Sequence, residues 1–161
     1  MKLHTLVTAS LLLVCSGAAL AAGIADSVEA ADPYVRAVPP GQPNSAAFMT
    51  LTNQSGEDHA LVAAESGASK VVELHTHVME EGMMKMRKVE KIDLPAGQAV
   101  SLQPGGLHVM LIGLQQELVP DQPVTLHLVF DDGSKKEIQA PVRKLQMKMG
   151  DMPADKMQHG H

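Results

Sequence analysis

Hydrophobic and polar residues alternate in short runs along most of the chain, and turn-forming residues separate these runs. Leu107, Val109 and Leu111 fall on one face of an extended segment. The intervening His108 and Met110 fall on the opposite face. A period of two is typical of β-strands. The alternation predicts strands over residues 34–38, 46–52, 59–65, 71–78, 84–92, 99–102, 108–112, 124–130 and 136–141.

The breaks between these runs are rich in Pro, Gly, Asn and Asp. Asp132-Gly133 stands between two β-rich runs and predicts a hairpin, because glycine accepts a positive φ at little steric cost. No long stretch has helical periodicity, and no internal repeat is evident. Many short strands at regular spacing favour an all-β fold, an antiparallel sandwich or barrel.

The N-terminus has the pattern of a secretory signal peptide over residues 1–21. Lys2 precedes an apolar run that ends at the small-residue site Ala19-Leu20-Ala21. The run is shorter than the roughly 20 residues that a membrane span needs, which disfavours a permanent anchor. Lipidation at Cys15 is disfavoured because Val14 is bulky. We therefore expect cleavage near Ala21 and a periplasmic protein without a membrane span.

Composition and charge narrow the function further. The formal net charge of −5 argues against a nucleic-acid partner, which usually needs a basic patch. Cys15 is the single cysteine, so the mature chain can form neither a disulfide nor a cysteine-ligated metal site. A blue-copper electron carrier is disfavoured on the same ground, because its site needs a cysteine.

Methionine and histidine are the conspicuous donors, with 11 and 8 copies. Three predicted strands each place two of them on a single face: His75 with His77, Met84 with Met86, and His108 with Met110. Thioether sulfur is a soft, neutral donor and imidazole is intermediate, so the two together suit Cu(I). We expect one Cu(I) to be bound by His75, Met86, His108 and Met110.

The neighbouring donors have no single interpretation. His77, Met79, Met83 and Met84 fit flanking ligands, an access path or surface positions equally well. Met49 lies in an apolar run and is expected in the core.

The spacing of the four expected ligands, His75-x10-Met86-x21-His108-x-Met110, resembles the motif of the periplasmic copper chaperones called PCu(A)C. The surrounding runs NSAAFMTLTN, ELH, GMMKMR and QPGGLHVMLIGL are similar to that family too, and the similarity covers roughly residues 33–142. The resemblance implies a cupredoxin-like β-sandwich or barrel in residues 22–142 with a solvent-accessible Cu(I) site. It also implies delivery of copper to a haem–copper respiratory oxidase, in some members alongside a thiol-bearing partner chaperone.

The C-terminal residues 143–161 lose the strand alternation and are expected to form a flexible tail. They hold further donors that we interpret as secondary copper ligands: Met147, Met149, Met152, Met157, His159 and His161. The two histidines, with oxygen donors, would also suit Cu(II).

A metal-transfer protein is therefore favoured over an enzyme. The acidic residues form no readable acid/base pair, and neither a Ser-His-Asp pattern nor a phosphate-binding loop occurs. Copper buffering or resistance without a dedicated client remains the alternative function, because it would use the same site.

Overall fold

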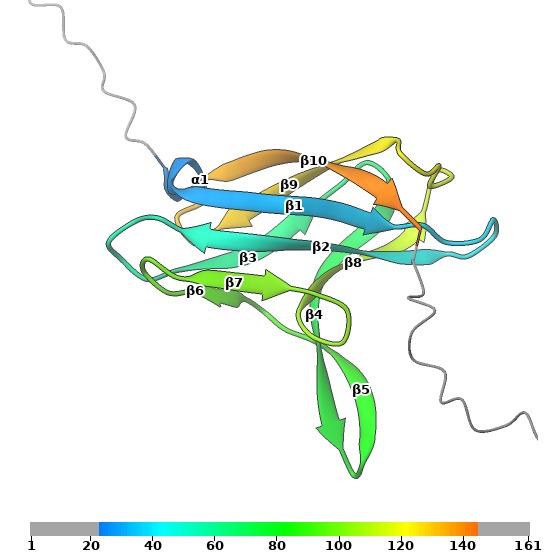
Figure 1. The fold of residues 1–161 in the computed structure, drawn as a ribbon, viewed down its shortest axis with the longest axis horizontal. Coiled ribbons are helices and arrows are strands. Elements are labelled where there is room, and N and C mark those ends of the chain that lie inside the picture. Colours follow the sequence, from blue (N-terminus) through cyan, green and yellow to red (C-terminus); the bar gives the residue numbers. More distant parts are fainter. Residues whose placement is uncertain (1–22, 145–161) are drawn as a thin grey trace, which may run out of the picture.

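The computed structural model describes residues 23–144, which form one short helix and ten strands (Figure 1). The elements are α1 (Ile24–Ser27), β1 (Val28–Arg36), β2 (Asn44–Asn53), β3 (His59–Glu65), β4 (Ser69–Glu80), β5 (Met83–Lys88), β6 (Ile92–Leu94), β7 (Ala99–Leu102), β8 (His108–Leu114), β9 (Pro123–Phe130) and β10 (Lys135–Arg143). Within these residues no helix is long and apolar enough to cross a membrane.

The strands pair in the order β5-β4-β8-β2-β1-β10-β9-β3-β6, and β7 adds to β2. This path has two free ends, so the sheet is not closed. All pairs are antiparallel except β1 with β10, which run parallel at Val35↔Val142 and Arg36↔Arg143. The all-β prediction is thus confirmed, with one short parallel contact that joins the first and last strands.

The core lies between the two runs of strands that meet at β1 and β10. Val109 and Leu111 on β8 are fully buried, as are Leu126 and Leu128 on β9, and all four belong to one hydrophobic cluster. Burying a leucine side chain stabilises a fold by about 1.5–3 kcal/mol, so strand alternation fixes which face of β8 turns inward. Met49 is 3% exposed and packs in this core, as expected.

Residues 22–32 are small and acidic, a composition that predicts a loose lead-in to the body. The described part of this run, residues 23–32, is instead ordered and forms α1 and the first half of β1. The backbone N–H of Ile24 donates to Asp132 Oδ2 at 2.8 Å, and that of Ala25 donates to Ser134 Oγ at 2.9 Å. These partners lie more than a hundred residues away, so no local pattern signals them.

The predicted strand over residues 84–92 is in fact two strands. β5 ends at Lys88 and pairs only with β4, whereas β6 starts at Ile92 and pairs with β3 at the opposite end of the sheet path. Between them the Val89 N–H donates to the Leu74 carbonyl at 2.9 Å. The chain crosses from one layer to the other here without a glycine or proline to mark the break.

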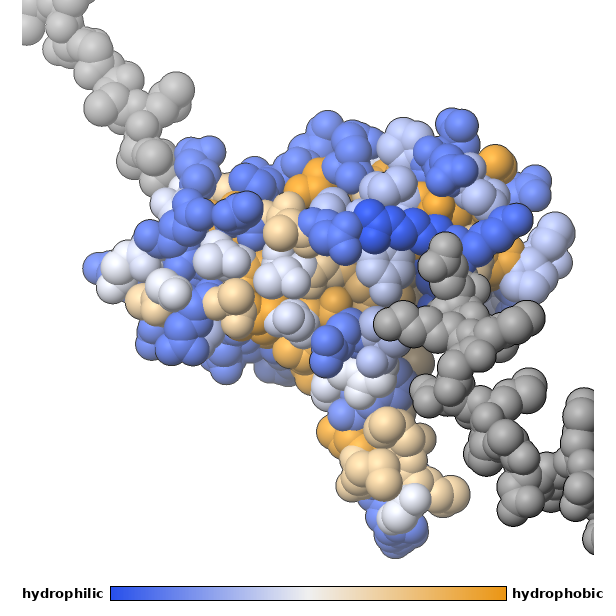
Figure 2. All heavy atoms as spheres, viewed as in Figure 1, coloured by the Kyte–Doolittle hydropathy of each residue, from blue (hydrophilic) through white to orange (hydrophobic). Residues whose placement is uncertain are grey.

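The outer part of β4 and all of β5 form a hairpin that projects beyond the body of the sheet (Figure 1). We call it the β4–β5 hairpin. Its tip consists of Glu81 and Gly82, with φ of 51° and 77°. Two positive φ angles identify the tight turn whose twist matches paired antiparallel strands. Every residue of β5 is exposed, and Figure 2 shows apolar surface on this projection.

Candidate metal centre

The expected ligands meet where β4 pairs with both β5 and β8. His75 lies directly opposite His108 across β4 and β8, and His77 lies opposite Met86 across β4 and β5. Met110 shares a face of β8 with His108. The ring centroid of His108 is 5.8 Å from that of His75 and 5.2 Å from that of His77. Three strands therefore bring imidazole and thioether groups to one face.

His108 is held in one orientation and one tautomer. Its side chain is almost completely buried, and its Nδ1 lies 3.0 Å from the Gly106 carbonyl oxygen. A carbonyl can only accept a hydrogen bond, so Nδ1 carries the proton and the neutral ring has its lone pair on Nε2. Such a second contact is the usual way in which a protein orients a metal-binding histidine.

Burial lowers the pKa of His108 below its ordinary value. The Gly106 carbonyl acts in the opposite direction and raises that pKa, while His77, His75 and Arg36 add to the lowering through charge repulsion. The net effect keeps the imidazole neutral. A neutral ring is the form that can donate its lone pair to a metal ion.

His75 is oriented by an acidic neighbour. Its Nε2 lies 2.9 Å from Glu73 Oε2, and the same carboxylate accepts a hydrogen bond from Lys88 Nζ at 2.8 Å. Lys88 first, and His75 second, lower the pKa of Glu73, so Glu73 is ionised and the Nε2 of His75 donates to it. In the neutral ring the lone pair is then on Nδ1.

Two buried ring nitrogens have no hydrogen-bond partner within residues 23–144. They are Nδ1 of His75 and Nδ1 of His77. An unsatisfied buried nitrogen is destabilising, and a bound metal ion would satisfy it. The donor chemistry of this face therefore fits a soft cation.

A cavity of about 370 Å³ opens on this face. Met86, His108 and Met110 all line it, so three of the four expected ligands share one cavity. His75 is not part of its wall, although its ring lies beside His108. His77 does line the cavity. Met86 is 46% exposed, which leaves the hairpin side of the site accessible to solvent.

The wall of the cavity also contains two residues that the sequence does not single out, Phe48 and Arg36. The Phe48 ring lies 6.2 Å from the His108 ring, and the Arg36 guanidinium stands 5.2 Å from the Phe48 centroid. Both come from β1 and β2, well before the histidines in sequence. No local motif signals them, but Glu73, at an i, i+2 distance from His75, could have been recognised as its carboxylate partner.

Nitrogen and oxygen donors do not by themselves form a metal site in this body. No group of three or more His, Cys, Asp or Glu side chains in residues 23–144 is arranged to hold a metal ion.

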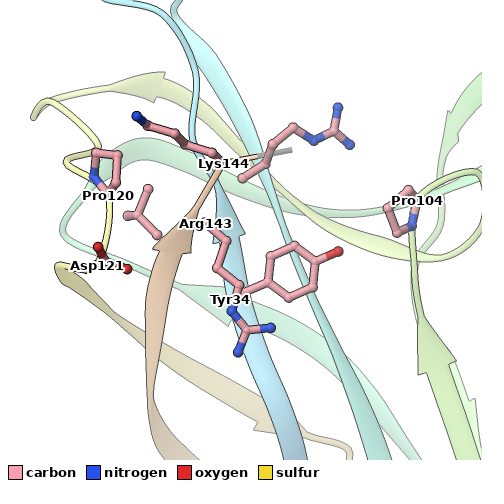
Figure 3. Close-up of a pocket in the computed structure, with 8 residues that line it drawn as sticks. Tyr34, Pro104, Pro120, Asp121, Arg143 and Lys144 are labelled. Atoms are coloured by element: carbon pink, nitrogen blue, oxygen red, sulfur yellow. The ribbon is translucent and has the colours of Figure 1, made fainter. Parts of the chain in front are cut away.

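Figure 3 shows a larger cavity, of about 640 Å³. It shares Arg36 and Pro104 with the cavity of the expected ligands. Tyr34 and Arg143 line it, with the guanidinium 5.0 Å from the ring centroid. Lys144 lines it as well. Among residues 23–144, none of those that line it carries a thioether or an imidazole.

The remaining expected donors lie outside the described residues. This applies to the signal sequence with Cys15 and to the tail donors Met147, Met149, Met152, Met157, His159 and His161.

Fold and site together define a small all-β domain that gathers histidine and methionine on neighbouring strands. The family model described as "Putative lipoprotein LpqE-like" matches residues 28–142, and the chain belongs to this LpqE-like family. A relative in Leifsonia xyli subsp. xyli, "Putative lipoprotein Lxx21020", is 33% identical over 120 residues, which is 74% of this chain and 71% of the relative.

Solved structures confirm the resemblance to PCu(A)C proteins and the cupredoxin-like fold. The PCuAC domain from PmoF2, described as copper-bound, matches with a TM-score of 0.63 and 22% identity, over 73% of this chain and 93% of that one. Apo-DR1885 from Deinococcus radiodurans matches with a TM-score of 0.59 and 33% identity, over 89% and 97%. The Cu(I) form of DR1885 matches with a TM-score of 0.56 and 36% identity, over 70% of this chain and 76% of that one.

Proposed function

We propose that this chain is a copper chaperone that binds one Cu(I) through His75, Met86, His108 and Met110. The observation that carries the proposal is the meeting of imidazoles and thioethers on β4, β5 and β8. The copper-bound PCuAC domain from PmoF2 and Cu(I)-DR1885 support it, because both are related in fold to this chain.

The donor set favours the reduced ion. Two imidazoles and two thioethers are neutral, so the bound unit keeps the single positive charge of Cu(I). A divalent ion gains more from thiolate or carboxylate donors, which this face lacks within ligand reach apart from Glu73, already paired with Lys88 and His75. In this arrangement Glu73 orients a ligand and does not bind the metal itself.

An exposed methionine suits transfer to a partner. Met86 is about half exposed while His108 is buried, so an incoming donor can replace the Met86 thioether first and the imidazoles afterwards. The proposed client is the copper centre of a haem–copper respiratory oxidase, reached in the periplasm, with a thiol-bearing copper chaperone as a further partner. Cleavage near Ala21 and the absence of a membrane span in the mature protein belong to the same proposal.

Copper buffering without a client is the alternative, and the phenotype of a gene deletion separates the two. Loss of oxidase activity at low copper supports delivery. Copper sensitivity with normal oxidase activity supports buffering.

The binding site is tested by competition with a Cu(I)-specific chelator, using wild type, His108→Ala and Met110→Leu. We expect one tightly bound ion in the described body and a loss of affinity of about tenfold or more in each variant. Met83→Leu is the matched control, because Met83 is an exposed methionine on the opposite face of β5. X-ray absorption of the Cu(I) protein should show both sulfur and nitrogen neighbours; nitrogen and oxygen alone would contradict the proposal.

A further inference from the structure

We propose that Met79 and Met84 form a second, exposed Cu(I) site on the β4–β5 hairpin, through which the ion reaches the main site. The inference rests on the proposed function, since it assumes that Cu(I) is the cargo. It assigns a role to two methionines that the fold itself does not require.

The register of the hairpin places the two residues together. Met79 lies directly opposite Met84, and the next pair inward on the same face is His77 opposite Met86. The side chains of directly opposed residues leave the backbone about 4.5–5.5 Å apart. Two flexible thioether side chains at that separation can hold one ion between their sulfur atoms.

The pair also lies within one step of the cavity. Residues two apart on a strand are about 7 Å apart, and Met84 and Met86 have this relation on β5. Met86 lines the cavity that contains His108 and Met110. An ion held by Met79 and Met84 can therefore acquire the Met86 thioether before it releases an outer one.

Packing does not account for these methionines. Met79 is 67% exposed and Met84 is 59% exposed, and neither belongs to the hydrophobic core. The opposite face of the hairpin is filled by ion pairs instead, where Glu80 accepts from Lys85 and Arg87. Soft donors are thus confined to the face that continues into the metal centre, with Met83 as the exception at the tip.

The chemistry is ligand exchange alone. Copper–sulfur bonds form and break in turn, the ion stays monovalent, and no proton or electron is transferred. Two thioethers bind Cu(I) more weakly than two thioethers with two imidazoles, so the ion moves inward on loading. A partner that offers stronger donors at the hairpin can reverse the direction.

The test uses the full chain with methionine methyl groups labelled for NMR and titrated with Cu(I). The first equivalent should shift the Met86 and Met110 methyl signals, and further Cu(I) should shift those of Met79 and Met84. In a Met79→Leu/Met84→Leu variant we expect unchanged affinity for the first equivalent and severalfold slower loading from a Cu(I)–chelator complex. Met83→Leu is the control and should load like wild type.

The outcomes separate this inference from the proposed function. If the first equivalent leaves Met86 and Met110 unshifted, the main site itself is wrong. If it binds there but excess Cu(I) leaves Met79 and Met84 unshifted and the double leucine variant loads normally, only the hairpin site is refuted. If loading is slowed in a Met79→Ser/Met84→Ser variant and not in the leucine variant, the pair is an apolar contact surface, which also refutes it.

Discussion

At the scale of single residues, His108 combines burial with a fixed direction for its lone pair. The Gly106 carbonyl accepts a hydrogen bond from Nδ1, and only 2% of the residue is exposed to solvent. A charged imidazolium is disfavoured in such a place. The neutral His108 ring can therefore offer the lone pair of its Nε2 to a metal ion.

Its titration should be visible in the stability of the metal-free protein. Burial lowers the pKa of folded His108 below 6.5, whereas the unfolded chain keeps a value near 6.5. As the pH falls through that value, the unfolded state takes up the proton first, so the free energy of unfolding should fall until the folded pKa is reached. Urea denaturation of wild type and His108→Gln at a series of pH values below 6.5 measures this effect. If the free energy of unfolding has the same slope against pH in both proteins, the lowered pKa does not belong to His108.

Glu73 should act on copper through His75. Glu73→Gln removes the charge that orients the His75 ring but keeps the shape of the side chain at position 73. We expect Cu(I) affinity to fall by about tenfold. Chelator competition measures the affinity, and circular dichroism checks the fold. Glu80→Gln is the matched control, since Glu80 forms ion pairs on the opposite face of the same hairpin. An equal loss in both variants would mean that hairpin order, and not ligand orientation, is responsible.

At the scale of elements, the β4–β5 hairpin depends on its turn more than on packing. Gly82 has a φ of 77°, and no atom lies within 4 Å of the place where a Cβ would stand. Alanine there would be strained by the backbone alone, at a cost of about 1–2 kcal/mol.

Gly82→Ala should therefore loosen the hairpin while leaving the body intact. We expect faster hydrogen exchange at the amides of β5, weaker Cu(I) binding because Met86 is less well placed, and normal exchange in β8 and β9. Gly56→Ala is the control, because Gly56 is equally open and has no positive φ. Unchanged exchange at β5 would show that the turn is not what orders it.

Local alternation explains which parts of the fold could be predicted. The predicted segments 59–65 and 99–102 coincide with β3 and β7, because each is a short run bounded by turn residues. Strand parity also placed His75 with His77, and His108 with Met110, since facing depends only on neighbours in sequence. The division between β5 and β6 could not be predicted, because it depends on the pairing of Ile92 with Leu61, which lies on another strand far away in sequence.

The same limit applies to the metal centre. The spacing in the sequence was enough to predict the four donors. His75 lies directly opposite His108 because of the register in which β4 and β8 pair. That Phe48 and Arg36 stand behind the ring depends on how β2 and β1 join β8, which no motif records. Alternation likewise places His77 on the same face as His75 but does not show how deeply its side chain is buried.

At the scale of the whole molecule, the last described residue, Lys144, comes just before the histidines and methionines of the C-terminal tail in the sequence. Lys144 lines the larger cavity, which shares Arg36 with the cavity of the metal centre. The sequence that follows contains four methionines and two histidines.

Truncation after Leu145 should therefore lower the copper stoichiometry, or slow capture, while the main site keeps its affinity. Titration of wild type and the truncated chain with Cu(I), and separately with Cu(II), distinguishes the two oxidation states. A His159→Ala/His161→Ala variant should lose only the Cu(II) component, because nitrogen donors suit the oxidised ion. Identical titration curves for all three chains would reject a role for the tail.

The parallel pairing of Val35 with Val142 joins residues that lie near opposite ends of the described chain. Along the strand path, the run β5-β4-β8-β2-β1 pairs with the run β10-β9-β3-β6 only at this point. Pairing between residues so far apart in sequence makes folding slower. Because Val142 lies on β10, the last strand, this seam cannot form until nearly all of residues 23–144 are available to fold.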